Sequence, residues 1–136
     1  MAAPSAGNQQ PWHFVIISNR EILNEIPKFH PYSKMLAQSP VAILVCGDIN
    51  TEKHKGYWIQ DCSAATENIL LAIHTLGLGA VWLGIHPRED RVDGIKKLLN
   101  LPDNISPLAL IALGYPAEKH PPADRFDKSK ERLFIA

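Results

Sequence analysis

The chain has 136 residues and a mass of 15.1 kDa, which is the size of one ordinary domain. It is 46% hydrophobic and 21% charged, a composition that can build a core and excludes disorder throughout. Fourteen basic residues balance fourteen acidic ones, so no charge excess points to nucleic acid or to an anionic membrane surface.

The first elements that the sequence predicts are a loop, a strand and a helix. Residues 1–11 are small, polar and rich in turn formers, and they predict a loop. Residues 12–17 are mostly apolar and predict a buried strand. Ser18 to Glu21 has the spacing of a capping box, which predicts a short helix that ends before Pro27. Residues 41–46 predict a second buried strand.

The longest predicted helix spans residues 57–76. Its apolar residues follow i, i+3, i+4 and i+7 spacing, and Leu70 and Leu71 add a second apolar side. A helix that is apolar on two sides is buried centrally or between subunits. Gly77 is placed to end the helix in a left-handed conformation, and residues 80–83 then predict a third strand.

The remaining sequence predicts a helix over residues 88–100, with Pro87 at its start, and a strand over residues 107–113. Residues 117–136 form a polar, extended tail, which is either disordered or lies across another surface. We treat residues 1–136 as one domain. Alternating strands and helices indicate an α/β or α+β sandwich around one sheet. Periodicity alone favours a parallel, doubly wound sheet and leaves the strand order open.

Polar side chains gather just before the first strand. Residues 4–12 read Pro-Ser-Ala-Gly-Asn-Gln-Gln-Pro-Trp and include one hydroxyl and three amides. Amides donate and accept hydrogen bonds without charge, which suits a neutral heterocycle or a polyol chain. Taken alone, however, such a segment is more often a surface turn.

Three ordered segments resemble the nitroreductase family of FMN-dependent NAD(P)H oxidoreductases. Residues 3–14 are similar to the signature loop of that family, residues 61–84 to its central helix and following strand, and residues 130–132 to its C-terminal basic pair. The resemblance implies an α+β fold, an α/β/α sandwich with a mixed, mainly antiparallel sheet. It also implies a homodimer whose C-terminal tail crosses to the partner, with FMN in a cleft at each subunit boundary.

The resemblance assigns one part of the flavin site to the N-terminal loop. Pro4 and Ser5 would line the ring near its reactive N5 atom. Asn8 would bind the polar pyrimidine side of the ring or the ribityl chain, and Gln10 or its neighbours would support it. These assignments come from position in the family motif.

The rest of the site is assigned to the strand after the central helix and to the tail. Leu83 and Gly84 would lie against the flavin from the other subunit, with Gly84 offering its backbone N–H. Lys130 and Arg132 would neutralise the phosphate, since cationic side chains are its usual partners. Without the other motifs, the basic pair would be read as a solvated tail.

The chemistry implied by the family belongs to the cofactor, so no side chain is assigned as catalytic. NADH or NADPH would reduce the flavin and leave, and a nitroaromatic, quinone or similar acceptor would then take the electrons, which is a ping-pong mechanism. The six histidines lack ligand spacing, so we expect no metal. No apolar run approaches the roughly 18 residues of a membrane span, and we expect a cytoplasmic protein.

Members of the family carry, before the signature loop, a helical segment of about thirty residues with an Arg-Arg-Ser-x-Arg motif that binds FMN. This sequence starts where that segment would end. Loss of two charge-assisted hydrogen bonds would weaken FMN binding by roughly two to four decades. An alternative is therefore a truncated, non-catalytic flavin-fold scaffold with weak or no FMN binding. A third is another reaction on the same fold, such as reductive dehalogenation or flavin destruction.

Overall fold

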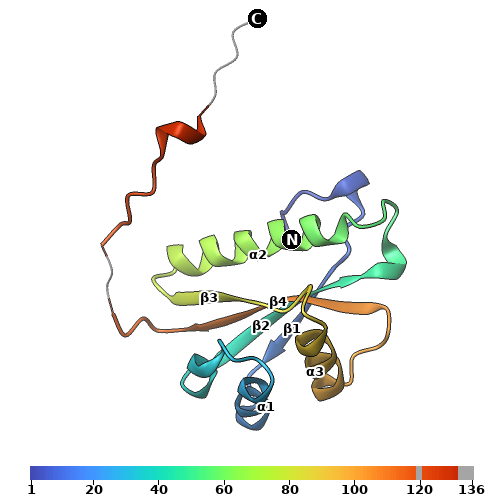
Figure 1. The fold of residues 1–136 in the computed structure, drawn as a ribbon, viewed down its shortest axis with the longest axis horizontal. Coiled ribbons are helices and arrows are strands. Elements are labelled where there is room, and N and C mark those ends of the chain that lie inside the picture. The colour runs from blue at the N-terminus through green and yellow to red at the C-terminus, as the bar shows by residue number, and fades with distance from the viewer. Residues whose placement is uncertain (119–120, 132–136) are drawn as a thin grey trace, which may run out of the picture.

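The computed structural model of the protein describes residues 1–118 and 121–131. In these residues four strands form one sheet in the order β1-β2-β4-β3 (Figure 1). The strands are β1 (Trp12–Ile17), β2 (Val41–Asp48), β3 (Gly79–Gly84) and β4 (Ile105–Gly114). Every neighbouring pair is antiparallel, which confirms the mainly antiparallel sheet that the family resemblance implied.

The parallel, doubly wound sheet favoured by periodicity is therefore wrong. β2 and β3 do run in the same direction and are joined across a helix, as periodicity suggested, but β4 lies between them and pairs antiparallel with both. The connections from β1 to β2 and from β3 to β4 return to a neighbouring antiparallel strand. The alternation of strands and helices is the same in both arrangements, so it cannot distinguish them.

Helices cover both faces of the sheet, which makes an α/β/α sandwich (Figure 1). The long helix α2 (Trp58–Thr75) lies on one face, and the shorter helices α1 (Arg20–Glu25) and α3 (Glu89–Leu99) lie on the other. α2 begins and ends one residue inside its predicted range. Gly77 follows it with a φ of 71°, which is the left-handed conformation that the sequence predicted there.

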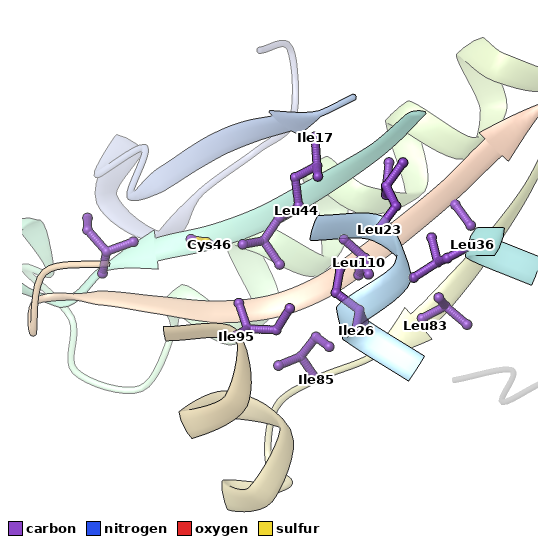
Figure 2. Close-up of a cluster of buried hydrophobic side chains, with 13 residues drawn as sticks. Ile17, Leu23, Ile26, Leu36, Leu44, Cys46, Leu83, Ile85, Ile95 and Leu110 are labelled. Carbon is purple, nitrogen blue, oxygen red and sulfur yellow. The ribbon is translucent and has the colours of Figure 1, made fainter. Parts of the chain in front are cut away.

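Each face has its own apolar core. Figure 2 shows the core under α1 and α3, where Leu44 and Leu110 of the sheet meet Leu23 of α1 and Ile95 of α3, and all four side chains are fully buried. The core under α2 is built by Trp12, Trp58, Cys62, Ala65, Ile73, Leu108, Ala109 and Ile111, among others. The central strands β2 and β4 are covered on both sides, so their sequences are apolar almost without interruption.

Two helix starts differ from the prediction. α1 is capped by Asn19, not by Ser18, because the Asn19 side chain accepts the backbone N–H groups of Glu21 and Ile22 at 2.8 and 3.2 Å. α3 begins at Glu89, two residues after Pro87. At α1 both Ser18 and Asn19 have suitable capping chemistry, and the path of the incoming chain decides which one caps, whereas the N-cap residue of α3, Arg88, makes no side-chain capping bond.

The C-terminal segment leaves the sandwich after β4. Residues 121–131 are exposed and lie apart from the sheet and helices (Figure 1), with one short 3-10 turn over Lys128–Lys130. In the part of the chain that the structure describes, no helix combines the length and apolarity needed to cross a membrane.

Candidate functional site

Buried polar contacts fasten the loop before β1 onto the first turn of α2. The Asp61 carboxylate, 4% exposed, accepts the backbone N–H of Ala6 at 2.9 Å and the side-chain amide of Gln9 at 2.7 Å. The Gln9 amide oxygen in turn accepts the backbone N–H groups of Lys53 and His54 at 2.9 and 3.1 Å. One side chain thus joins the loop, the helix and the segment before the helix.

The same loop has an unusual backbone. Gly7, Asn8 and Gln10 have φ values of 53°, 52° and 48°, in the left-handed backbone region that residues other than glycine rarely adopt. The Ser5 hydroxyl accepts the backbone N–H of Gln10 at 3.0 Å and so closes the loop on itself. A Cβ at Gly7 would lie 2.6 Å from the His54 ring, so a side chain there would force this ring to move. Strain of this kind persists where surrounding contacts enforce it, and it is concentrated at functional sites.

Two of the predicted site residues line a hollow against α2. The hollow has a volume of about 370 Å³, and its walls are Pro4, Ser5, Ala6, Tyr57, Gln60, Asp61 and Ala64. The structure therefore brings Pro4 and Ser5 to the start of the central helix. Asn8 and Gln10 are exposed in the same loop but do not line this hollow.

A second part of the predicted site, Leu83 and Gly84, lies at the end of β3, which is an edge strand of the sheet. The Leu83 side chain is 4% exposed and belongs to the core under α1 and α3, so Leu83 offers a ligand its backbone and not its side chain. A Cβ built on Gly84 would meet nothing within 4 Å, so this position borders open space. A flat ring could approach the backbone there.

The ladder of hydrogen bonds between β3 and β4 also sets the direction of the Gly84 backbone groups. β3 pairs Gly84 with Ala109, and the next residue, Ile85, donates its N–H to the Leu108 carbonyl at 3.1 Å. Hydrogen-bonded and non-hydrogen-bonded pairs alternate along an antiparallel ladder, so the N–H and C=O of Gly84 point away from β4. The backbone N–H that the family resemblance assigns to the flavin therefore lies on the free edge.

Both parts of the predicted site meet the first turn of α2. The ring of His86, two residues after Gly84, packs edge-on against Trp58 with 5.1 Å between ring centroids. The Trp58 backbone N–H is bound by the Glu52 carboxylate at 3.0 Å. Trp58 and Asp61 are one helical turn apart, so the start of α2 supports both the N-terminal loop and the segment that follows β3.

The predicted phosphate ligand Lys130 is not at this place in the single chain. The Lys130 side chain is 80% exposed, and its ammonium group lies 3.7 Å from the Asp127 carboxylate within the tail. Arg132 lies outside the described residues. The chain by itself therefore does not bring Lys130 to the loop or to Gly84.

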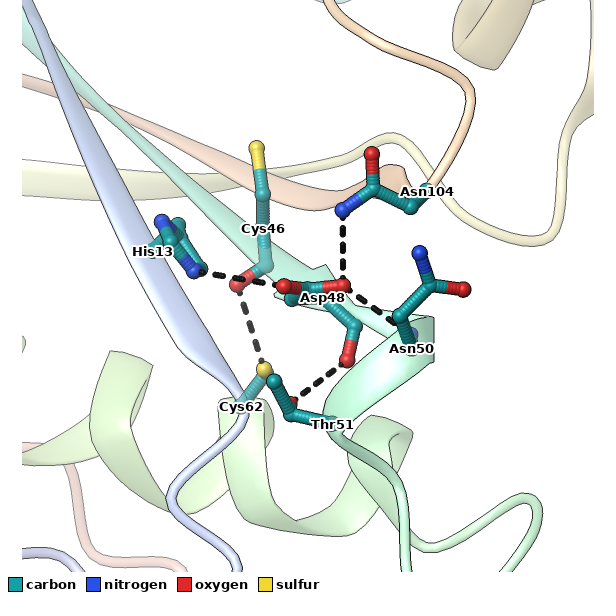
Figure 3. A network of polar contacts seen from close by, with 7 residues as sticks. All are labelled: His13, Cys46, Asp48, Asn50, Thr51, Cys62 and Asn104. Carbon is teal, nitrogen blue, oxygen red and sulfur yellow. Dashed lines mark hydrogen bonds and ion pairs between the residues drawn. The ribbon is translucent and has the colours of Figure 1, made fainter.

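A polar network at the end of β2 is structural (Figure 3). The Asp48 carboxylate accepts the Asn104 amide at 2.8 Å and the Asn50 backbone N–H at 2.9 Å. The hydrogen bond from Asn104 is the main cause that holds the pKa of Asp48 below its ordinary value. His13 lies 3.9 Å from the same carboxylate, beyond hydrogen-bond distance, so the pair is not a catalytic dyad.

The two cysteines are unreactive. They belong to cores on opposite faces of the sheet, and Cys62 donates its S–H to the Cys46 carbonyl at 3.4 Å (Figure 3). Burial raises the pKa of each thiol to about 12, so neither forms the thiolate that nucleophilic chemistry needs. Among the described residues no three His, Cys, Asp or Glu side chains group as metal ligands.

A larger hollow, of about 700 Å³, lies at the opposite end of β3. Its walls include Pro40, Gly79, Gly114 and Tyr115, and it contains none of the predicted site residues.

Comparison with known proteins gives this architecture a class. The structure of a "Putative NADH Oxidase" from Clostridium acetobutylicum superposes with a TM-score of 0.94 at 43% identity, over 98% of this chain and 81% of that one. A "putative nitroreductase in complex with fmn" from Desulfovibrio desulfuricans superposes with a TM-score of 0.80 at 30% identity, over 98% of this chain and 79% of that one. The sandwich is thus the fold of the nitroreductases.

The sequence comparisons agree. The model of the Nitroreductase family matches residues 27–115. A "Putative NADH dehydrogenase/NAD(P)H nitroreductase" from Methanothermobacter thermautotrophicus is 52% identical over 133 residues, which cover 98% of this chain and 70% of that protein. The chain belongs to the nitroreductase family and is a nitroreductase-like oxidoreductase.

Proposed function

We propose that this chain binds FMN and passes electrons from NADH or NADPH to a nitroaromatic, a quinone or a similar acceptor by a ping-pong mechanism. The observation that carries the proposal is the strained amide loop, which Gln9 and Asp61 hold on the start of α2. A loop held in this costly conformation presents uncharged donors and acceptors in a fixed arrangement, which is what the polar side of a flavin requires.

The residues present fit the ring of FMN. Gly84 offers an outward N–H beside open space, and an added side chain would occupy that space. Pro4 and Ser5 would border the ring near N5, while Asn8 would bind its pyrimidine side or the ribityl chain and Gln10 or its neighbours would support Asn8. Leu83 would contact the ring through its backbone only, since its side chain is in the core.

The phosphate would be held by Lys130 and Arg132 of a crossing tail. The tail has few contacts of its own in the single chain, because residues 121–131 are exposed and lie apart from the sandwich. Aromatic Phe126, 72% exposed, lies within the tail and would be buried when the tail crosses to a second subunit. A basic pair on such a tail would then reach the phosphate of a shared site.

A homodimer would also cover the outer side of α2. Leu71, on this helix, is 55% exposed, and Leu76, just after it, is 73% exposed. Leu70 is half-buried. Apolar residues at these positions are unfavourable in water but would pack against the same helix of a partner. Of the second apolar side seen in the sequence, Leu70 packs against the core under α2, whereas Leu71 stays exposed in the single chain.

FMN, when bound, supplies the hydride and electron transfer. The protein would supply position and environment: the amide loop would orient the ring, and Gly84 would offer it a backbone N–H. The buried thiols have no part, since their pKa values keep them protonated.

The test begins with the purified chain and with FMN added to it. We expect flavin absorbance or quenching of FMN fluorescence, a dimer by light scattering, and FMN-dependent oxidation of NADH or NADPH when menadione or a nitrobenzoate is supplied. A dimer that fails to take up FMN would instead support the non-catalytic scaffold. A monomer without flavin binding would refute the proposal.

A further inference from the structure

The side chains of Arg91 and His30 both bind the backbone oxygen of Gly84. Arg91, in the first turns of α3, donates from Nη1 to this oxygen at 2.7 Å. His30, in the connection between α1 and β2, lies with its Nε2 3.0 Å from the same oxygen. A carbonyl oxygen only accepts, so Nε2 carries the proton of the neutral ring. Two donors occupy both lone pairs of the oxygen.

The His30 part of the cluster is buried, and several contacts hold the cluster together. The His30 side chain is 1% exposed, and its backbone carbonyl accepts the hydroxyl of Ser33, itself fully buried, at 2.8 Å. The Arg91 guanidinium lies 5.6 Å from the centre of the Tyr32 ring, and Tyr32 meets the His30 ring edge-on. Burial lowers the pKa of His30, which keeps the ring neutral.

The cluster is also costly for the fold. Within the described residues, the buried atoms Nδ1 of His30 and Nε of Arg91 have no hydrogen-bond partner. A buried polar atom without a partner destabilises a protein, and an apolar pair of the same volume would avoid that loss. An arrangement that leaves two such atoms in order to place two donors on one oxygen calls for a reason beyond stability.

We propose that His30 and Arg91 are positioning residues that hold the Gly84 backbone in the orientation in which its N–H meets the flavin ring. This inference rests on the proposed FMN function. A glycine at the end of an edge strand has no side chain to fix its conformation. The N–H of Gly84 belongs to the preceding peptide, which the ladder holds through Leu83. The two donors on the Gly84 carbonyl hold the following peptide, together with the Ile85 N–H that donates to Leu108, so both peptides that flank the glycine are fixed and its N–H keeps one direction.

Arg91 has a second effect, because its positive charge binds the Gly84 carbonyl, beside the proposed position of the flavin ring. A fixed positive charge close to a flavin stabilises the electron-rich reduced ring more than the oxidised ring. Arg91 should therefore raise the reduction potential of bound FMN, whereas the neutral His30 should act on orientation alone.

The test compares four variants with wild type. His30→Leu and Arg91→Met remove a donor at similar volume, and His30→Gln and Arg91→Lys retain one. The matched control is Arg88→Met, because Arg88 lies beside the same helix with a side chain that is 66% exposed and paired with Asp90. The measurements are the FMN dissociation constant from fluorescence quenching, the flavin midpoint potential, and the unfolding temperature of the flavin-free protein.

We expect His30→Leu and Arg91→Met each to weaken FMN binding by about tenfold, which corresponds to one lost hydrogen bond. His30→Gln should restore most of the affinity. Arg91→Met alone should shift the potential to a more negative value, and Arg91→Lys should restore it in part. Arg88→Met should match wild type in all three measurements.

Two results separate this inference from the proposed function. If wild type binds FMN, and the donor-removing variants lower the unfolding temperature without changing affinity or potential, the cluster is structural and the inference is refuted while the function stands. If wild type does not bind FMN, both are refuted. If His30→Leu fails to fold, the comparison of Arg91→Met with Arg91→Lys tests the inference instead, because Arg91 is partly exposed and its substitution disturbs the core less.

Discussion

Replacing Gln9 by leucine removes the contact that fastens the signature loop to α2. The change keeps the volume of the side chain but deletes one charge-assisted hydrogen bond to Asp61 and two bonds from backbone N–H groups. The charge-assisted bond contributes about 1.5–3 kcal/mol, and the two backbone bonds contribute less because Lys53 and His54 are exposed and can bind water. We expect the free energy of unfolding to fall by about 3 kcal/mol.

In a chain of this size, that loss lowers the unfolding temperature by about 10 °C. Thermal unfolding followed by circular dichroism measures it on the flavin-free protein. FMN affinity should fall as well, because the left-handed residues of the loop lose the contact that enforces their conformation.

The matched control is Gln10→Leu, in the adjacent amide. Its side chain is exposed and makes no hydrogen bond among the described residues, so its unfolding temperature should stay within about 2 °C of wild type. If Gln9→Leu also unfolds that close to wild type, then Gln9 does not anchor the loop, and the reasoning from its buried contacts is refuted.

Three further predictions concern pH, the ring face and the outer side of α2. Because burial lowers the pKa of His30 from 6.5, the unfolded chain takes up a proton that the folded chain refuses, so the free energy of unfolding should fall as pH drops below about 6.5. Urea unfolding between about pH 8 and about pH 5 measures this dependence on pH. The same dependence of the free energy of unfolding on pH in His30→Gln would contradict the prediction. Gly84→Ala should leave the stability of the protein unchanged or slightly higher, because the added Cβ meets open space. The same variant should weaken FMN binding by at least about tenfold, and an unaltered affinity would place the ring elsewhere. The double variant Leu71→Glu, Leu76→Glu should be monomeric by light scattering, and a persistent dimer would mean that another surface joins the subunits.

Local patterns determined the helices and strands of this chain to within one or two residues. The apolar run at residues 41–46 is inside β2, and the periodic segment at 57–76 is α2 with one residue added at each end. Hydrophobic periodicity reports how a segment meets the core, which is a property of neighbouring residues. It contains no information on which strand lies beside which, and so the insertion of β4 between β2 and β3 could not be predicted from it.

The site divides in the same way. A polar segment with Gly and Pro marked the loop at residues 4–11, but nothing in a run of three amides distinguished buried Gln9 from exposed Asn8 and Gln10. Asp61 lies in the first turn of α2, and only the fold shows that its carboxylate anchors the loop.

The sequence by itself determined the elements, the apolar sides of the long helix and, through three ordered motifs, the family of this protein. Only the tertiary structure decided that Gln9 meets Asp61, and that His30 and Arg91, far apart in the chain, both bind the oxygen of Gly84. The physical reason is that burial of a polar side chain is stable only with a partner, and the partner is chosen by how the layers pack against the sheet.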